Sequence, residues 1–173
     1  MTTIRWRRES LAVLATLLLG TTVEAEGQTT DFRPVLDAWL TCVECRAGQL
    51  DSVRVWAALR PAVVYALRDD LIGGPSPERR HRLTDQLTST YQGVAQRAAE
   101  AHAGGQVYSE AQYVRRYLDK LIQIYQGRAA LALGAIGGPA ARAILDSALT
   151  LPARTFSPGV LSRIRFARDS IRP

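Results

Sequence analysis

The stretch from Gly127 to Leu149, GRAALALGAIGGPAARAILDSAL, constrains the fold more than any other part of the 173-residue chain. Its pattern predicts two short apolar helices that meet at Gly137-Gly138-Pro139, because glycine ends helices and proline fits a first helical turn. Alanine and glycine on both helices allow the backbones to approach closely, while leucine and isoleucine supply the apolar contact. Such a pair cannot bury both of its faces alone, so the rest of the chain is expected to pack around it.

A second helical pair is predicted between Asp51 and Leu71, with its corner at Arg60-Pro61. Placing Pro61 on Pro139, an offset of 78 positions, makes apolar residues of the two stretches coincide. The coincident pairs are Val53 with Leu131, Val55 with Leu133, Leu67 with Leu145 and Leu71 with Leu149. The two stretches look like copies of one helix-turn-helix unit, although unrelated amphipathic hairpins can align to a similar degree.

The stretch from Arg128 to Leu149 resembles the HEAT-like repeat of the phycobilisome lyase type, in which an alanine-rich helix, a Gly-Gly-Pro corner and an alanine-leucine helix recur. The resemblance is good for this unit and partial for Asp51 to Leu71, and together they cover about a quarter of the chain. It implies an α-α superhelix that serves as a binding scaffold, with no catalytic residue and no cofactor of its own. Because units of intermediate similarity are missing between the copies, we expect an irregular HEAT-like helical domain.

Apolar residues recur at helical spacing between Phe32 and Val43 and predict an amphipathic helix, with Pro34 in its first turn and Gly48 just past its end. A later helix is predicted to start at Ser76-Pro77-Glu78, where serine caps the first turn and proline and glutamate suit it.

That later helix is predicted to fade near His102, where Gly104-Gly105 breaks the pattern. Ser109 and Gln112 then form a capping box at the start of the next helix. Gly127 either bends this helix into the opening motif or separates two helices.

A last amphipathic helix follows Ser157-Pro158-Gly159. Its apolar side is made of Val160, Ile164, Ala167 and Ile171. No stretch shows the sustained apolar-polar alternation of a strand, so the sequence predicts an all-α protein.

Residues 1–25 have the pattern of a secretory signal peptide, with a basic start, an apolar stretch from Leu11 to Val23 and small residues that favour cleavage after Ala25. The apolar stretch is shorter than the roughly 20 residues of a membrane span. We therefore expect an exported protein, periplasmic or secreted, without a transmembrane segment in the mature chain. A twin-arginine signal and an uncleaved anchoring helix are the alternatives.

The remaining chain is expected to consist of a short linker, residues 26–30, and one helical domain, residues 31–173. The formal net charge is +6 and comes almost wholly from arginine, since Lys120 is the only lysine. Basic residues cluster at Arg79, Arg80 and Arg82 and near the C-terminus, but only Phe166 is interleaved with them, so we expect no nucleic-acid partner.

Cys42-Val43-Glu44-Cys45 is the sharpest chemical motif in the chain. Two cysteines three apart on a helix have Cα atoms at roughly 5 Å, within the range of a disulfide. A structural disulfide at the end of the first helix is the leading interpretation for an exported protein. A thiol-redox pair and a pair of free thiols or metal ligands are the alternatives, and Arg46 stands where c-type haem attachment needs histidine.

The histidines and the single acidic residues give weaker evidence for a chemical site. His81 and His102 are expected to cap or border helices, and single acids are expected on hydrophilic helix faces: Asp69, Asp70, Asp85, Asp119 and Asp146. No spacing among them suggests paired-carboxylate catalysis, and no cofactor or metal site is predicted.

The middle of the chain is rich in tyrosine, and a set of these residues is the predicted partner-binding surface: Tyr91, Tyr113, Tyr117 and Tyr125. The sequence thus favours a non-enzymatic, exported helical-repeat scaffold that offers a groove between helices to an unidentified protein partner. The alternative is a thiol-redox or metal-binding protein that uses Cys42 and Cys45.

Overall fold

The computed structural model describes residues 31–42, 44–100, 108–152 and 154–172. Phe32–Pro173 form one unit of closely packed helices. The predicted signal peptide, residues 1–25, and linker, residues 26–30, lie outside the described residues. The predicted helix break at His102 to Gly105 lies outside them too.

The described residues form α-helices and contain no strand, which confirms the all-α prediction. The helices are α1 (Arg33–Thr41), α2 (Ala47–Leu59), α3 (Ala62–Gly73), α4 (Pro77–Glu100), α5 (Glu110–Ile136), α6 (Gly138–Thr150) and α7 (Pro158–Ser170). Among these helices, none is both long enough and apolar enough to cross a membrane.

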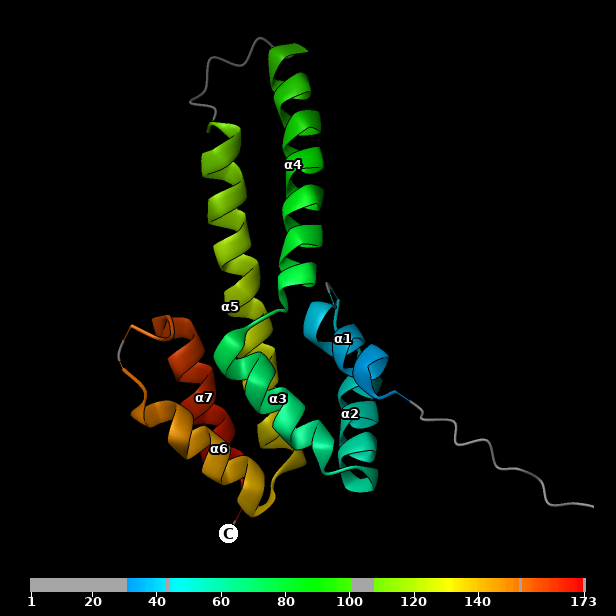
Figure 1. The fold of residues 1–173 in the computed structure, drawn as a ribbon, viewed down its shortest axis with the longest axis vertical. Coiled ribbons are helices and arrows are strands. Elements are labelled where there is room, and N and C mark those ends of the chain that lie inside the picture. The colour runs from blue at the N-terminus through cyan, green and yellow to red at the C-terminus, as the bar shows by residue number, and fades with distance from the viewer. Residues whose placement is uncertain (1–30, 43, 101–107, 153, 173) are drawn as a thin grey trace, which may run out of the picture. The chain divides into compact units, whose positions relative to one another are not determined.

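The second half of α5 is the centre of the core, and α1, α2, α3, α6 and α7 all pack on it (Figure 1). Small residues there permit close approach. A Cβ atom on Gly134 would lie 2.8 Å from Cβ of Ala167 and 2.9 Å from its backbone, so α5 and α7 cross at a point where only glycine fits. Gly127 plays a similar part, because the side chain of Arg163 lies across it. The helix is continuous through Gly127.

The predicted corner between the two apolar helices is confirmed. Gly137 and Gly138 have φ of 71° and 78°, a conformation that L side chains rarely adopt, and they join α5 to α6. Gly74, with φ of 71°, ends α3 in the same way. The capping box of Ser109 and Gln112 is also present at the start of α5.

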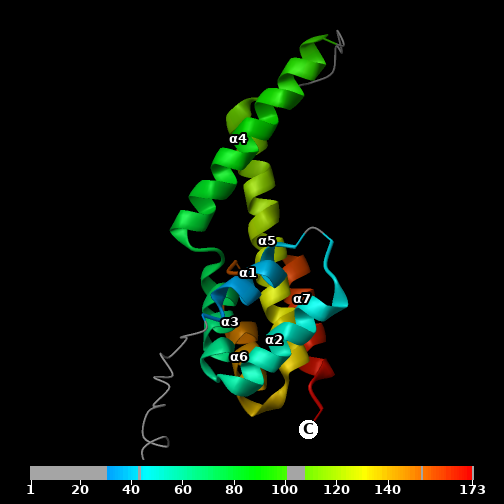
Figure 2. The same cartoon turned by 90° about the vertical axis from the view of Figure 1, so that its right-hand side faces the viewer.

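The first half of α5 and the whole of α4 form an antiparallel hairpin that extends away from the other helices in both views (Figures 1 and 2). All buried residues of α5 lie between Tyr125 and Leu133. One continuous helix therefore passes from the hairpin into the core at Tyr125.

The predicted first helix ends earlier than expected. It stops at Thr41, whose Oγ binds the carbonyl oxygen of Asp37, and Cys42 takes an extended backbone conformation. Gly48 does not terminate this helix but lies in the first turn of α2. A short non-helical connection that contains the cysteine pair separates the two helices, and an apolar periodicity cannot reveal such a break.

The two predicted copies correspond to α2–α3 and to the end of α5 with α6. Leu67 and Leu145 are both fully buried at equivalent positions. The aligned pair of Val55 and Leu133 differs in burial, since Val55 is 58% exposed whereas Leu133 is fully buried. The second unit lies at the centre of the domain and the first at its side.

Candidate functional site

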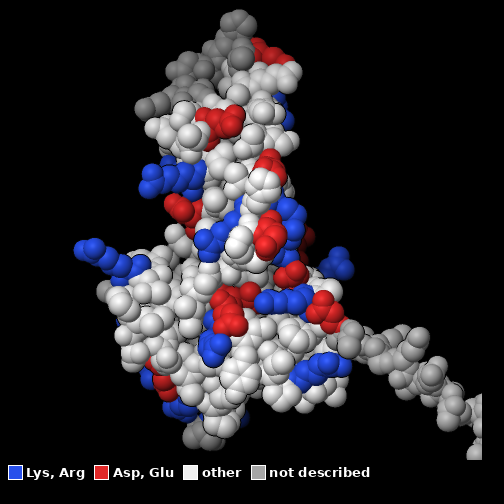
Figure 3. Space-filling view, in the orientation of Figure 1, with Lys and Arg blue, Asp and Glu red and all other residues white. Residues whose placement is uncertain are grey.

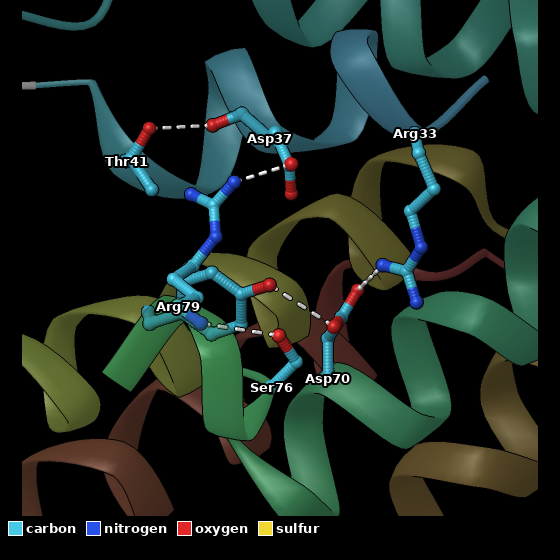
Figure 4. A network of polar contacts seen from close by, with 7 residues as sticks. Arg33, Asp37, Thr41, Asp70, Ser76 and Arg79 are labelled. Carbon is cyan, nitrogen blue, oxygen red and sulfur yellow. Dashed lines mark hydrogen bonds and ion pairs between the residues drawn. The ribbon is translucent and has the colours of Figure 1, made fainter. Parts of the chain in front are cut away.

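A polar network joins α1, α3, α4 and α5 at the base of the hairpin (Figure 4). Its centre is Asp70, which is only 5% exposed. The guanidinium of Arg33 donates to Oδ2 of Asp70 at 2.8 Å, and the Tyr125 hydroxyl donates to Oδ1 at 3.0 Å. Each carboxylate oxygen of Asp70 thus has a partner inside the protein, as buried charges require.

Arg79, in the first turn of α4, extends this network. Its guanidinium pairs with the carboxylate of Asp37 on α1 and lies 6.0 Å from the ring centre of Tyr125. Its backbone N–H donates to Oγ of Ser76 at 3.3 Å, which caps the helix. Arg79 therefore fixes the start of α4 against α1 and α5.

Burial raises the pKa of Asp70 above its ordinary value of 3.8, although Arg33 and Tyr125 act in the opposite direction. Burial and the neighbouring Asp70 also raise the pKa of Tyr125. Arg33 is much more exposed than Asp70, with side-chain exposures of 43% and 7%, so it compensates the buried charge only in part. With both oxygens engaged, the carboxylate joins α3 to α1 and α5 and is not placed as a general base.

The position of Asp70 corrects the prediction that it lies on a hydrophilic face. It follows Val63 by seven residues and Leu67 by three, which places it on the apolar stripe of α3. That spacing was a signal in the sequence. The partners Arg33, Asp37 and Arg79 carried no such signal, because long-range pairing is not visible in local patterns.

A cleft of about 570 Å³ lies beside the network. It is lined by Thr41 of α1, by Leu121 of α5 and by one face of α4: Arg79, Arg82, Leu83, Gln86, Leu87 and Thr90. The leucines give it apolar walls, and Arg82 places positive charge at one end, where Arg79 is already paired with Asp37. We call this feature the basal cleft.

The tyrosines lie one or more helical turns beyond the basal cleft, because Tyr91 follows Leu87 by four residues on α4 and Tyr117 precedes Leu121 by four on α5. The ring centres of Tyr91 and Tyr113 are 5.4 Å apart, and those of Tyr113 and Tyr117 are 4.4 Å apart. Tyr117 is 40% exposed, and Tyr91 and Tyr113 are half-buried. Tyr125 does not join them, because it is 4% exposed and hydrogen-bonded to Asp70. The predicted tyrosine surface is thus reduced to three members.

The sulfur atoms of Cys42 and Cys45 are 1.99 Å apart, at disulfide distance, with a Cα–Cα distance of 5.2 Å. The prediction that the pair lies on a helix is wrong, because both cysteines lie in the connection between α1 and α2. Cys42 is the first residue after α1, and Cys45 precedes Arg46, the N-cap of α2. Cys42 is half-buried against the core, whereas Cys45 is exposed.

Arginines of both basic clusters contact other parts of the chain. Arg80 donates through Nε to the carbonyl oxygen of Pro75 at 2.8 Å and so braces the turn between α3 and α4. Arg168 lies 3.7 Å from the carboxylate of Asp146. On the face shown in Figure 3, acidic and basic side chains are interspersed and form no patch of one sign.

The remaining candidates stay apart. His81 is exposed and lies 3.5 Å from Asp85 on the same helix, while His102 lies outside the described residues. Within the described part of the chain, no three histidine, cysteine or acidic side chains gather as a metal site would need.

Comparison of the chain with models of known families, with curated proteins and with solved structures gave no match. The HEAT-like resemblance accordingly stays a prediction, and the site is interpreted from its own geometry.

Proposed function

We propose that this chain is a non-enzymatic, exported scaffold that binds a partner protein along one surface of the α4–α5 hairpin. This surface, which we call the hairpin strip, consists of the basal cleft together with Tyr91, Tyr113 and Tyr117. The proposed architecture is an irregular HEAT-like superhelix. Its support is the presence of two helix pairs, α2–α3 and α5–α6, that turn at equivalent positions.

The observation that carries the proposal is the isolation of α4. Among the described helices, only α5 packs along the length of α4, and α1 is held to its first turn by the Arg79–Asp37 pair. Of its described side chains, only Leu87 is buried. Leu83 and Tyr91, on the apolar stripe of α4, are only half-buried, so part of this stripe stays open to a further helix.

The composition of the hairpin strip suits a helical partner. Tyrosine and arginine are enriched in the cores of protein interfaces, and leucine side chains offer apolar contact. A partner helix with apolar residues three and four positions apart could lie in the basal cleft, and an acidic residue at one end would face Arg82.

Export is proposed on the sequence pattern of residues 1–25, and the disulfide is compatible with it. Disulfides persist in oxidising compartments such as the periplasm and the extracellular space.

Site-specific photo-crosslinking tests the proposal. A photoreactive phenylalanine analogue at Tyr117 should give a discrete adduct with one protein from cell-envelope extract. The same analogue at Phe166, a 67% exposed aromatic residue on α7, is the matched control and should not give that adduct. The Leu83→Glu variant should lose the adduct while keeping the helical circular dichroism signal. Identical adducts from both positions, or none from Tyr117, would contradict the proposal.

A second candidate function is thiol–disulfide exchange at Cys42 and Cys45. The specific observation in its favour is that the disulfide lies at the surface, in the connection between α1 and α2, with one exposed sulfur-bearing residue. Exposed disulfides are accessible to thiolates, whereas buried structural ones are not.

A further inference from the structure

The two cysteines of the disulfide lie in unequal surroundings. Cys45 is exposed and stands immediately before the N-terminus of α2. Cys42 is half-buried and stands immediately after the C-terminus of α1. The N-terminal end of a helix stabilises a negative charge and the C-terminal end destabilises one. The two helix ends therefore act in opposite directions on the two sulfur atoms.

The local hydrogen-bonding groups reinforce this difference. The sulfur of Cys42 lies 3.0 Å from the carbonyl oxygen of Trp39. A carbonyl accepts a hydrogen bond from a thiol but offers nothing to a thiolate, so this contact favours protonated Cys42 once the disulfide is reduced. The sulfur of Cys45 has a longer contact of the same kind, at 3.9 Å from the carbonyl oxygen of Cys42.

Charged side chains lie near both cysteines, and the cation that α5 supplies offsets part of the unfavourable effect of the α1 C-terminus on a Cys42 thiolate. Glu44 and Arg46 are both exposed, flank Cys45 on either side in sequence and oppose each other in sign. On α5, the guanidinium of Arg128 binds the carbonyl oxygen of Leu40 at 3.1 Å, at the end of α1. This contact satisfies a terminal carbonyl of α1.

Contacts other than the disulfide also hold the end of α1 on the core. Trp39 donates through Nε1 to the carbonyl oxygen of Arg128 at 3.1 Å, and Arg128 donates back to that of Leu40. Leu36 and Leu40 are fully or almost fully buried. A disulfide that closes so short a loop removes little entropy from the unfolded chain, so it contributes little to stability. The reduced form is thus expected to keep the fold, as an exchange reaction requires.

We propose that Cys45 is the sulfur that exchanges with substrate and that Cys42 is the resolving cysteine, with exposed dithiols of peptides or proteins as the substrate class. This inference rests on the second candidate function above. In the first step a substrate thiolate attacks the sulfur of Cys45, the Cys42–Cys45 bond breaks, and Cys42 leaves as a thiolate that takes up a proton from solvent.

In the second step the other substrate thiolate attacks the substrate sulfur of the mixed disulfide. The bond to Cys45 breaks, and Cys45 leaves as a thiolate. Two electrons pass from the substrate dithiol to the protein disulfide, so the substrate becomes a disulfide and the protein a dithiol. In the reverse direction the thiolate of Cys45 attacks a substrate disulfide and Cys42 resolves the intermediate.

Two single-cysteine variants of the full chain test the assignment, and each is the matched control of the other. Cys42→Ser leaves Cys45 free, and Cys45→Ser leaves Cys42 free. Alkylation by iodoacetamide at pH 7 should be about tenfold faster for Cys45, with a titration midpoint below the ordinary thiol value of about 8.5. The midpoint for Cys42 should lie above that value. Equal rates, or a faster Cys42, would overturn the assignment, provided that circular dichroism shows both variants folded.

A separate measurement distinguishes failure of this assignment from failure of the second candidate function. The oxidised native chain is incubated with dithiothreitol, and oxidised dithiothreitol is followed by absorbance. Reduction without unfolding supports exchange at this disulfide whichever sulfur is attacked. A disulfide that is reduced only after denaturation would reject both the exchange function and the assignment of Cys45.

Discussion

Helices α3 and α4 show how differently the two regions of the domain are built. Helix α3 buries five residues in its 12-residue length: Val63, Val64, Leu67, Asp70 and Leu71. Helix α4 has 24 residues, and of those whose side chains are described only Leu87 is buried. The core region is stabilised by the packing of several helices on one another, whereas the hairpin relies on one helix–helix contact, on tyrosine rings in tilted contact, on helix caps and on the Arg79–Asp37 pair at its base.

This difference indicates that the core region supplies the stability of the fold and that the hairpin is the region available for binding. Burial of apolar surface is the main source of folding free energy, so the core region is expected to set the global stability. The hairpin is expected to open locally at lower free energy, because few of its side chains are buried. Regions of that kind are available for partners, and the following substitutions test the division.

The largest effect is expected from one leucine-to-alanine substitution made in each region. Leu67→Ala removes a fully buried side chain from α3 and should lower the free energy of unfolding by about 3 kcal/mol. Leu118→Ala removes a half-buried side chain from the hairpin part of α5 and should cost about 1 kcal/mol. Urea unfolding followed by circular dichroism measures both. Equal losses would remove the distinction between the two regions.

A glycine-to-alanine substitution should change the free energy of unfolding in opposite directions in the two regions. Gly134→Ala forces a Cβ atom against Ala167 of α7 and should destabilise the fold by about 1–3 kcal/mol. Gly93→Ala adds a Cβ atom with no heavy atom within 4 Å, inside helix α4, and should stabilise it by about 0.5–1 kcal/mol. Thermal unfolding of the two variants beside the native chain gives the comparison. A stabilising Gly134→Ala would show that α5 and α7 do not cross as described.

The smallest effect concerns Asp70 at the boundary between the regions. Because burial raises its pKa above 3.8, the folded chain holds this proton more tightly than the unfolded chain. The contribution of Asp70 to the free energy of unfolding should therefore fall as pH rises from about 4 through the folded pKa, and it should stay lower above that pKa. Asp70→Asn has no such titration, so the free energy of unfolding of the variant relative to the native chain should increase between pH 3.5 and pH 7. Urea midpoints at these two pH values measure it, and a constant difference would contradict the pKa shift.

Much of the local structure was predictable from the sequence. The Gly137-Gly138-Pro139 corner, the capping box at Ser109 and the apolar face of α7 follow from local chemistry, which acts within a few residues. The position of Tyr125 was not predicted, because an amphipathic stripe shows which face of α5 is apolar but not where along it the core begins. That boundary is set by contacts with α3, far away in sequence.

The cysteine pair shows the same limit at a shorter range. Its spacing indicated a disulfide, and its sulfur atoms do lie at disulfide distance. The helix break beside it was not predicted, because the apolar periodicity of Phe32 to Val43 continues past Thr41. Only the extended backbone at Cys42 reveals that the pair connects two helices with ends of opposite polarity.

The continuity of α5 has a mechanical consequence. Residues 110–124 project roughly 22 Å beyond the core, at 1.5 Å per residue, and an unbroken α-helix over this distance is a stiff rod. Force applied at the tip of the hairpin acts as torque about the point where Tyr125 holds Asp70. A load on the hairpin tyrosines would therefore pass along one unbroken helix to the polar network at Tyr125 and to the packing of α7 on Gly134.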